Sequence, residues 1–175
     1  DKIILLNSAL KNAQLSLKRI TKEYLSNKYI STNELLLLAK KTFQLSYIPN
    51  YIVAFDISHL QATYIVGASI SYKKGVPYKK GYKHYLINNQ LGNNDPACIF
   101  EIVYRCLKQI ISNNSLLPDL LLIDGGKAQL ESANKALHEL SLQNKIAVFA
   151  LAKQEEEFYS LNEKYPIKLL ARSEE

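Results

Sequence analysis

The chain of 175 residues has no tryptophan and no methionine, and it has only two cysteines. Cys98 and Cys106 make a poor disulfide framework and fall on one face of a predicted helix, so they are most simply core residues of a reduced, cytosolic protein. No apolar run reaches the ~18 residues that a membrane-spanning helix needs. The N-terminus lacks a signal-peptide pattern, because lysines are scattered through it. The missing methionine and the first residue, Asp1, predict an excerpt of a longer polypeptide.

Positive charge is in excess, with 22 Lys and Arg against 16 Asp and Glu and a formal net charge of +6. Such a balance suits a polyanionic partner such as nucleic acid. The alternative is codon bias, since Lys, Asn, Ile and Tyr are all abundant, as in AT-rich genomes. Charge alone does not separate the two. The length and a hydrophobic content of 47% suffice for one large domain, or for one domain with an appendage.

Residues 1–48 are predicted to form a helical leader. Its first helix has apolar residues at three- and four-residue spacing, namely Leu5, Leu6, Ala9, Leu10, Ala13, Leu17 and Ile20. A second helix is predicted from Ser31 to Phe43, with Glu34 in its first turn. The Pro49-Asn50 pair breaks the helical pattern. Residues 49–175 are therefore predicted to form the following domain.

This second part alternates between strand and helix patterns. Apolar and β-branched runs predict five strands, over 51–57, 63–72, 80–87, 119–124 and 145–151. One helix is predicted to start with Asp95 as its N-cap and Pro96 at the first helical position, and another spans about 127–140. The first three strands follow one another through short turns and are antiparallel, whereas the later ones are reached through helices and are parallel. After Lys153 the chain is acidic and irregular. The sequence predicts an α/β fold with a mixed five-stranded sheet flanked by helices.

The order of these elements resembles the ribonuclease H-like fold, in which the first and fourth strands are parallel neighbours. Asp56 ends the first predicted strand and Asp124 ends the fourth. Neighbouring strands are about 4.8 Å apart, so the two carboxylates would approach each other and repel. A bound Mg²⁺ or Mn²⁺ would remove this repulsion, and oxygen ligands suit these ions better than Zn²⁺. Such a metal can activate water for phosphodiester hydrolysis.

Each aspartate also has a structural alternative. Asp124 precedes Gly125 and Gly126 and could cap a helix, while Asp56 could belong to a strand-end turn. Gly125-Gly126-Lys127 is a possible phosphate seat at a helix start, but it lacks the P-loop spacing. His59 and Gln61 lie just past Asp56, although a lone histidine is more often a structural hydrogen bonder.

Three motifs in order resemble the UvrC family, the incision subunit of bacterial nucleotide excision repair. They are Phe55-Asp-Ile-Ser-His-Leu-Gln61, Leu117-Pro-Asp-Leu-Leu-Leu-Ile-Asp-Gly-Gly-Lys-Ala-Gln-Leu130 and Leu151-Ala-Lys-Gln-Glu-Glu-Glu157. The resemblance covers the family's C-terminal endonuclease half, from about residue 50 onward. It implies a ribonuclease H-like, metal-dependent endonuclease that cuts damaged double-stranded DNA 5′ to a lesion. UvrB is the implied partner, with UvrA acting upstream.

The resemblance assigns the family's two catalytic aspartates to Asp56 and Asp124. The family's catalytic histidine lies in a later motif that is absent here, and none of His59, His84 or His138 matches its context. The fragment alone is therefore expected to be inactive or nearly so.

Other positions are predicted to contribute less. The residues expected around the scissile phosphate or along the DNA are His59, Gln61, Lys127, Gln129 and Lys83. Lys83 stands in Tyr82-Lys-His-Tyr85, where the family has a Tyr-Arg-Arg-Tyr-like strand. Glu101 and Lys153 are possible accessory residues, with a solvated glutamate and a Lys–Glu network as their structural alternatives. Two other functions stay open. The first is a nuclease-like module that binds DNA or a partner without cutting. The second is another ribonuclease H-like enzyme of resolvase or transposase type.

Overall fold

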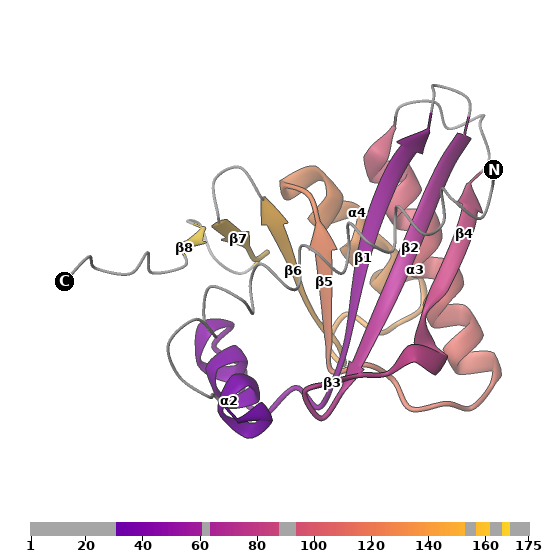
Figure 1. The fold of residues 1–175 in the computed structure, drawn as a ribbon. Coiled ribbons are helices and arrows are strands. Elements are labelled where there is room, and N and C mark those ends of the chain that lie inside the picture. The colour runs from indigo at the N-terminus through magenta and orange to yellow at the C-terminus, as the bar shows by residue number, and fades with distance from the viewer. Residues whose placement is uncertain (1–30, 61–63, 88–93, 153–156, 162–165, 169–175) are drawn as a thin grey trace.

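The structure, a computed structural model, describes residues 31–60, 64–87, 94–152, 157–161 and 166–168 (Figure 1). The helix predicted over the first 30 residues lies outside these ranges. The elements follow in the order α2 (Thr32–Thr42), β1 (Tyr51–Leu60), β2 (Tyr64–Lys73), β3 (Val76–Pro77), a 3-10 turn (Lys79–Gly81), β4 (Lys83–Ile87), α3 (Asp95–Ser112), β5 (Leu120–Asp124), α4 (Lys127–Glu139), β6 (Ala147–Ala152), β7 (Glu157–Tyr159) and β8 (Ile167–Lys168). No helix in this part of the chain is long and apolar enough to cross a membrane.

The strands form one mixed sheet in the order β3-β2-β1-β5-β6-β7-β8, and β4 also pairs with β2. β1, β5 and β6 are parallel neighbours, while β2, β3, β4, β7 and β8 join in antiparallel fashion. The predicted α/β class and mixed sheet are confirmed. The predicted number of five strands is wrong, because the described sheet has eight.

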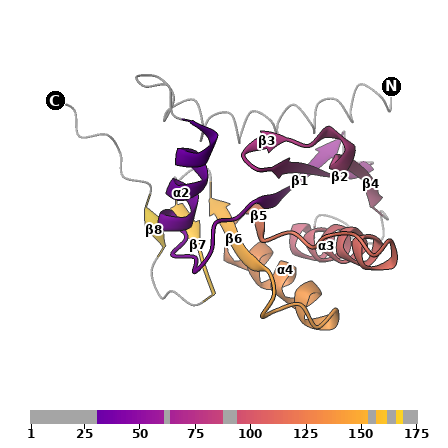
Figure 2. The same ribbon diagram turned by 90° about the horizontal axis from the view of Figure 1, so that it is seen from below.

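Helices α3 and α4 cover one face of the sheet (Figure 2). Alternate residues of β1 and β5 point toward them, among them Val53, Phe55, Leu121 and Ile123. Gly67 lets α3 approach closely, since a Cβ at this position would lie 2.8 Å from Cγ2 of Ile102. Cys98 and Cys106 are buried and unpaired by a disulfide, as expected of core residues.

The opposite face carries a smaller apolar cluster that joins α2 to the β6–β7 end of the sheet. Phe43, at the end of α2, lies 4.6 Å from Phe149 and 4.9 Å from Phe158, measured between ring centroids. Ile52, Leu120 and Leu122 belong to the same cluster. Residues of β1 and β5 therefore alternate between two separate cores, as a strand covered on both faces requires.

The helix starts follow local capping chemistry. Ser31 and Glu34 form the predicted capping box of α2, with Ser31 N–H donating to Glu34 Oε2 at 2.7 Å. The N-cap of α3 is Asn94, whose Oδ1 accepts from Ala97 N–H at 3.1 Å, rather than the predicted Asp95. Asp95 is in the first turn instead, where its negative charge interacts favourably with the positive end of the helix dipole.

Candidate active site

The two strand-end aspartates lie on neighbouring parallel strands. β1 and β5 pair in register up to Phe55 with Ile123, and Asp56 and Asp124 come directly after this pair. The backbones of the two aspartates are therefore about one strand spacing apart, roughly 4.8 Å. The predicted adjacency of the first and fourth strands is confirmed.

Both aspartates belong to the sheet face that α3 and α4 do not cover. Phe55 and Ile123 point into the α3–α4 core, so the next residue of each strand points to the other side. Asp56 is buried, with 7% of its surface exposed, and Asp124 is partly exposed. A buried carboxylate is costly unless charge or hydrogen bonds compensate it. Two carboxylates on one face at this spacing thus form a suitable pair of ligands for a hard cation.

The donor set at this position consists of oxygens. Two carboxylates supply part of the coordination that Mg²⁺ or Mn²⁺ prefers, with water in the remaining positions. Among the residues that the structure describes, no group of three or more His, Cys, Asp or Glu side chains forms a ready metal cluster. The aspartate pair fits a hydrated divalent ion better than a closed structural metal site.

The turn after Asp124 is held by a glycine and a glutamine. Gly125 has a φ of +150° and donates its N–H to Leu151 O at 3.0 Å. Gly126 is the N-cap of α4, and its N–H donates to Gln129 Oε1 at 3.1 Å. Gln129 therefore fixes the backbone that follows Asp124. Its contact with DNA stays a prediction.

Lys127 is exposed at the start of α4, and its Nζ lies 5.6 Å from the centroid of the Tyr159 ring on β7. Its charge and the N–H groups of the first helical turn, which have no partner within the helix, both lie next to the Asp124 turn. This arrangement favours an anion at the start of α4, as the glycine pair predicts.

Two predicted residues lie away from the aspartate pair. Lys83 and Glu101 are on the α3 side of the sheet, where Lys83 Nζ donates to Gln109 Oε1 at 2.6 Å and Glu101 Oε1 bridges Arg105 at 2.9 Å. The accessory role predicted for Glu101 gains no support, because its described partner is Arg105. Gln61, Lys153 and the side chain of His59 are outside the described parts of the chain.

One histidine that the sequence analysis set aside lies in line with the aspartates. Asp56 pairs with Ala68 on β2, and Ala68 pairs with His84 on β4. Paired residues share a face of the sheet, so the exposed His84 is on the aspartate side, about two strand spacings from Asp56. Desolvation by neighbouring groups lowers the pKa of the His84 side chain below its ordinary value of 6.5. This alignment follows from the pairing register of β1, β2 and β4, which could not be read from the sequence.

Residues 40–175 match the family model of the UvrC RNAse H endonuclease domain. The chain belongs to this family. The recognition based on three motifs is confirmed, and the ribonuclease H-like assignment agrees with it.

Curated relatives support the same assignment. The chain is 42% identical over 142 residues to the UvrABC system protein C of Flavobacterium psychrophilum, covering 81% of this chain and 24% of that protein. It is 39% identical over 163 residues to that of Leptospira biflexa, covering 93% and 26%. It is 39% identical over 176 residues to the UvrABC system protein C of Borrelia recurrentis, covering 99% of this chain and 28% of that protein. The chain thus spans about a quarter of the length of these relatives.

Two solved endonuclease V structures resemble the fold at low sequence identity. The protein of Ciona intestinalis, in complex with an inosine-containing 23mer DNA, matches with a TM-score of 0.42 and 14% identity over 71% of this chain and 59% of its own. Human ENDOV matches with a TM-score of 0.42 and 10% identity over 69% and 58%. The family assignment does not depend on these two similarities.

Proposed function

We propose that this chain is the metal-dependent endonuclease domain that makes the 5′ incision in nucleotide excision repair. The observation that carries the proposal is the placement of Asp56 and Asp124 on one face at the ends of parallel neighbours β1 and β5. Membership of the UvrC endonuclease family supports the reaction type. In this reaction a phosphodiester bond of the damaged strand is hydrolysed.

Asp56 and Asp124 would hold Mg²⁺ or Mn²⁺, which when bound supplies an activated water and stabilises charge on the leaving oxygen. A bound cation would offset the repulsion between the two carboxylates. The chain's own groups have two further roles. The Gly125-Gly126 turn, fixed by Gln129, holds Asp124 at the end of β5. Lys127 and the first amides of α4 attract a phosphate of the strand.

The proposed substrate is damaged double-stranded DNA, in agreement with the net charge of +6. UvrB is the proposed partner, and UvrA acts before it in the pathway. We place the reaction in the cytoplasm. The relatives are UvrABC system proteins, which supports the choice of DNA and of these partners.

The test is Asp124→Asn in the whole protein that carries these residues. With a damaged duplex labelled at its 5′ end and with UvrA and UvrB present, we expect 5′ incision to fall by at least about 10²-fold, since loss of outer-shell groups alone costs about 10–100-fold. Binding of the damaged duplex should remain. Unchanged 5′ incision would remove Asp124 from the reaction.

The matched control is Asp119→Asn. Asp119 stands just before β5, where Oδ2 accepts from Tyr51 N–H at 2.8 Å. An asparagine keeps this acceptor oxygen while removing the same charge. Incision by the control should therefore stay close to that of the wild type.

A further inference from the structure

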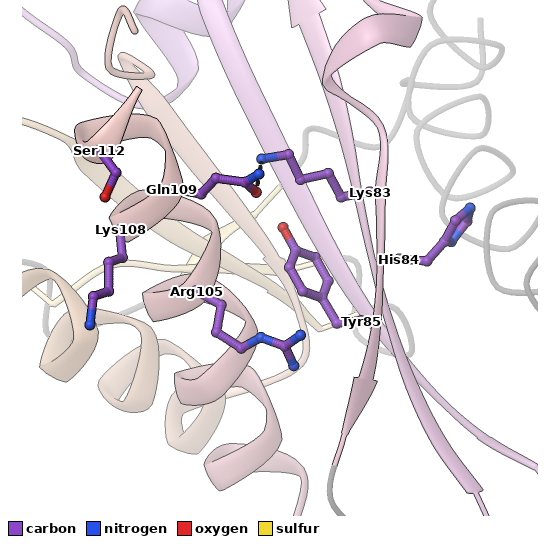
Figure 3. Close-up of a pocket in the computed structure, with 7 residues that line it drawn as sticks. All are labelled: Lys83, His84, Tyr85, Arg105, Lys108, Gln109 and Ser112. Atoms are coloured by element: carbon purple, nitrogen blue, oxygen red, sulfur yellow. Dashed lines mark hydrogen bonds between the residues drawn. The ribbon is translucent and has the colours of Figure 1, made fainter. Parts of the chain in front are cut away.

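A second charged feature lies on the opposite side of the sheet from the aspartates. An open groove of about 630 Å³ runs between β4 and α3 (Figure 3). It is lined by Lys83, His84, Tyr85, Arg105, Lys108, Gln109 and Ser112. Figure 3 shows Lys83 and Gln109 reaching toward each other and His84 pointing away, on the far side of β4. The groove is open to solvent along its length, so an extended ligand can reach the side chains that line it.

The groove carries an excess of positive charge. Three of its seven lining residues, Lys83, Arg105 and Lys108, are cationic, and none is acidic. Glu101 lies beside the groove and pairs with Arg105. Across the described residues, Lys83 and Lys108 have no comparable ion pair with a carboxylate. Burial raises the pKa of Tyr85, which therefore adds no negative charge. The three positive charges and the one negative charge of Glu101 sum to a net charge of +2, which attracts an anion to the groove.

The cationic side chains are held in place before any ligand binds. Lys83 donates to Gln109 at 2.6 Å, which leaves both amide N–H bonds of Gln109 available as donors. Arg105 Nη1 donates to Leu86 O at 3.1 Å, and its guanidinium lies 5.4 Å from the Tyr85 ring centroid. Lys108 Nζ lies 5.4 Å from the Tyr104 ring centroid. Groups that are already ordered lose less entropy when they bind.

The strand register separates this groove from the aspartate site. Lys83 pairs with Ser69, and Ser69 pairs with Phe55, the residue before Asp56. Phe55 points into the α3–α4 core, so Lys83 shares the helix-covered side of the sheet. The groove opens beside β4, two strands away from β1. A segment of a ligand that occupies this groove therefore lies away from the aspartates.

We propose that the β4–α3 groove binds the phosphodiester backbone of nucleic acid, as a second contact away from the cleaved bond. Ammonium, guanidinium, amide and hydroxyl donors are the groups that contact phosphates without reading sequence. The choice of nucleic acid as the polyanion rests on the proposed function. The contact itself needs neither the metal nor the aspartates.

The test measures metal-free DNA binding by the 175-residue chain. A fluorescein-labelled, undamaged 20-base-pair duplex is titrated in EDTA at several salt concentrations, with fluorescence anisotropy as the readout. The variants are Lys83→Ala, Lys108→Ala and their double variant, and Lys83→Arg tests rescue by a retained charge. The control is Lys145→Ala, which removes one charge from an exposed position outside the groove. Circular dichroism establishes that each variant is folded.

We expect the slope of log K against log salt to fall by about 1 per lost lysine, and so by about 2 in the double variant. Lys83→Arg should bind like the wild type, and Lys145→Ala should lose clearly less than either groove variant. Equal losses in the groove variants and in Lys145→Ala would overturn the proposal, as would absence of wild-type DNA binding. Stronger competition by polyglutamate than by unlabelled duplex would assign the groove to an acidic protein instead. Because EDTA is present, failure here leaves the metal-dependent reaction untouched.

Discussion

Considered alone, each strand-end aspartate could be a turn residue or a metal ligand. The register of β1 and β5 changes this, because it places both on one face and next to each other. Asp56 is almost fully buried, with 7% of its surface exposed. The sequence predicted this pair from strand order. It did not predict that His84 lies in line with Asp56 or that Gln129 caps the following turn.

The turn after Asp124 gives a prediction at the residue scale. Gly125 has a φ of +150°, and a Cβ there would lie 2.7 Å from Cγ of Gln129. Gly125→Ala should reduce the free energy of unfolding by about 1–3 kcal/mol, as strained backbone positions do. Urea denaturation followed by circular dichroism measures the change.

Gly126→Ala is the matched control for this turn. The nearest atom to a Cβ there is Gln129 Oε1 at 3.9 Å, so the added methyl group meets no steric obstacle. The loss at this N-cap position should stay below about 1 kcal/mol. A loss at Gly126 equal to that at Gly125 would contradict the assigned role of the positive φ.

At the scale of elements, the order of strands and helices along the chain was predictable because hydrophobic runs and short turns report local structure. The adjacency of β1 and β5 was predicted from the resemblance to the ribonuclease H-like fold. The short strands β7 and β8 were not predicted, since their neighbours are acidic and their pairing depends on long-range packing of Phe158 and Ile167. The strand predicted over 80–87 is β4, which begins only at Lys83, because the residues before it form a 3-10 turn. These differences arise where tertiary contacts decide the backbone, whereas the start of α3 and both ends of α4 were predicted to within about one residue.

Phe43 gives a prediction at this scale, because it joins α2 to β6 and β7 through Phe149 and Phe158. Phe43→Ala should destabilise the chain by about 3 kcal/mol, the lower end for a buried phenylalanine. Leu37→Ala removes a side chain of the same helix that is 51% exposed, and it should change stability by less than about 0.5 kcal/mol. Equal effects of the two substitutions on the urea midpoint would show that α2 is not anchored through Phe43.

The whole domain presents two charged features on opposite sides of one sheet. The acidic pair is at the ends of β1 and β5, and the basic groove lies between β4 and α3. In the proposed account the acidic pair performs hydrolysis and the basic groove holds the phosphate backbone elsewhere. This division explains how a chain of net charge +6 can keep two neighbouring carboxylates for a cation while attracting a polyanion.

Calorimetric titration of the chain with Mn²⁺ tests the central claim most directly. The wild type should bind Mn²⁺ saturably, and both Asp56→Asn and Asp124→Asn should lose at least about tenfold in affinity, since each removes one ligand charge. Asp119→Asn, which changes a carboxylate bonded to Tyr51 N–H, should bind like the wild type. If Mn²⁺ binds equally well to the wild type and to both strand-end variants, Asp56 and Asp124 do not form the metal site.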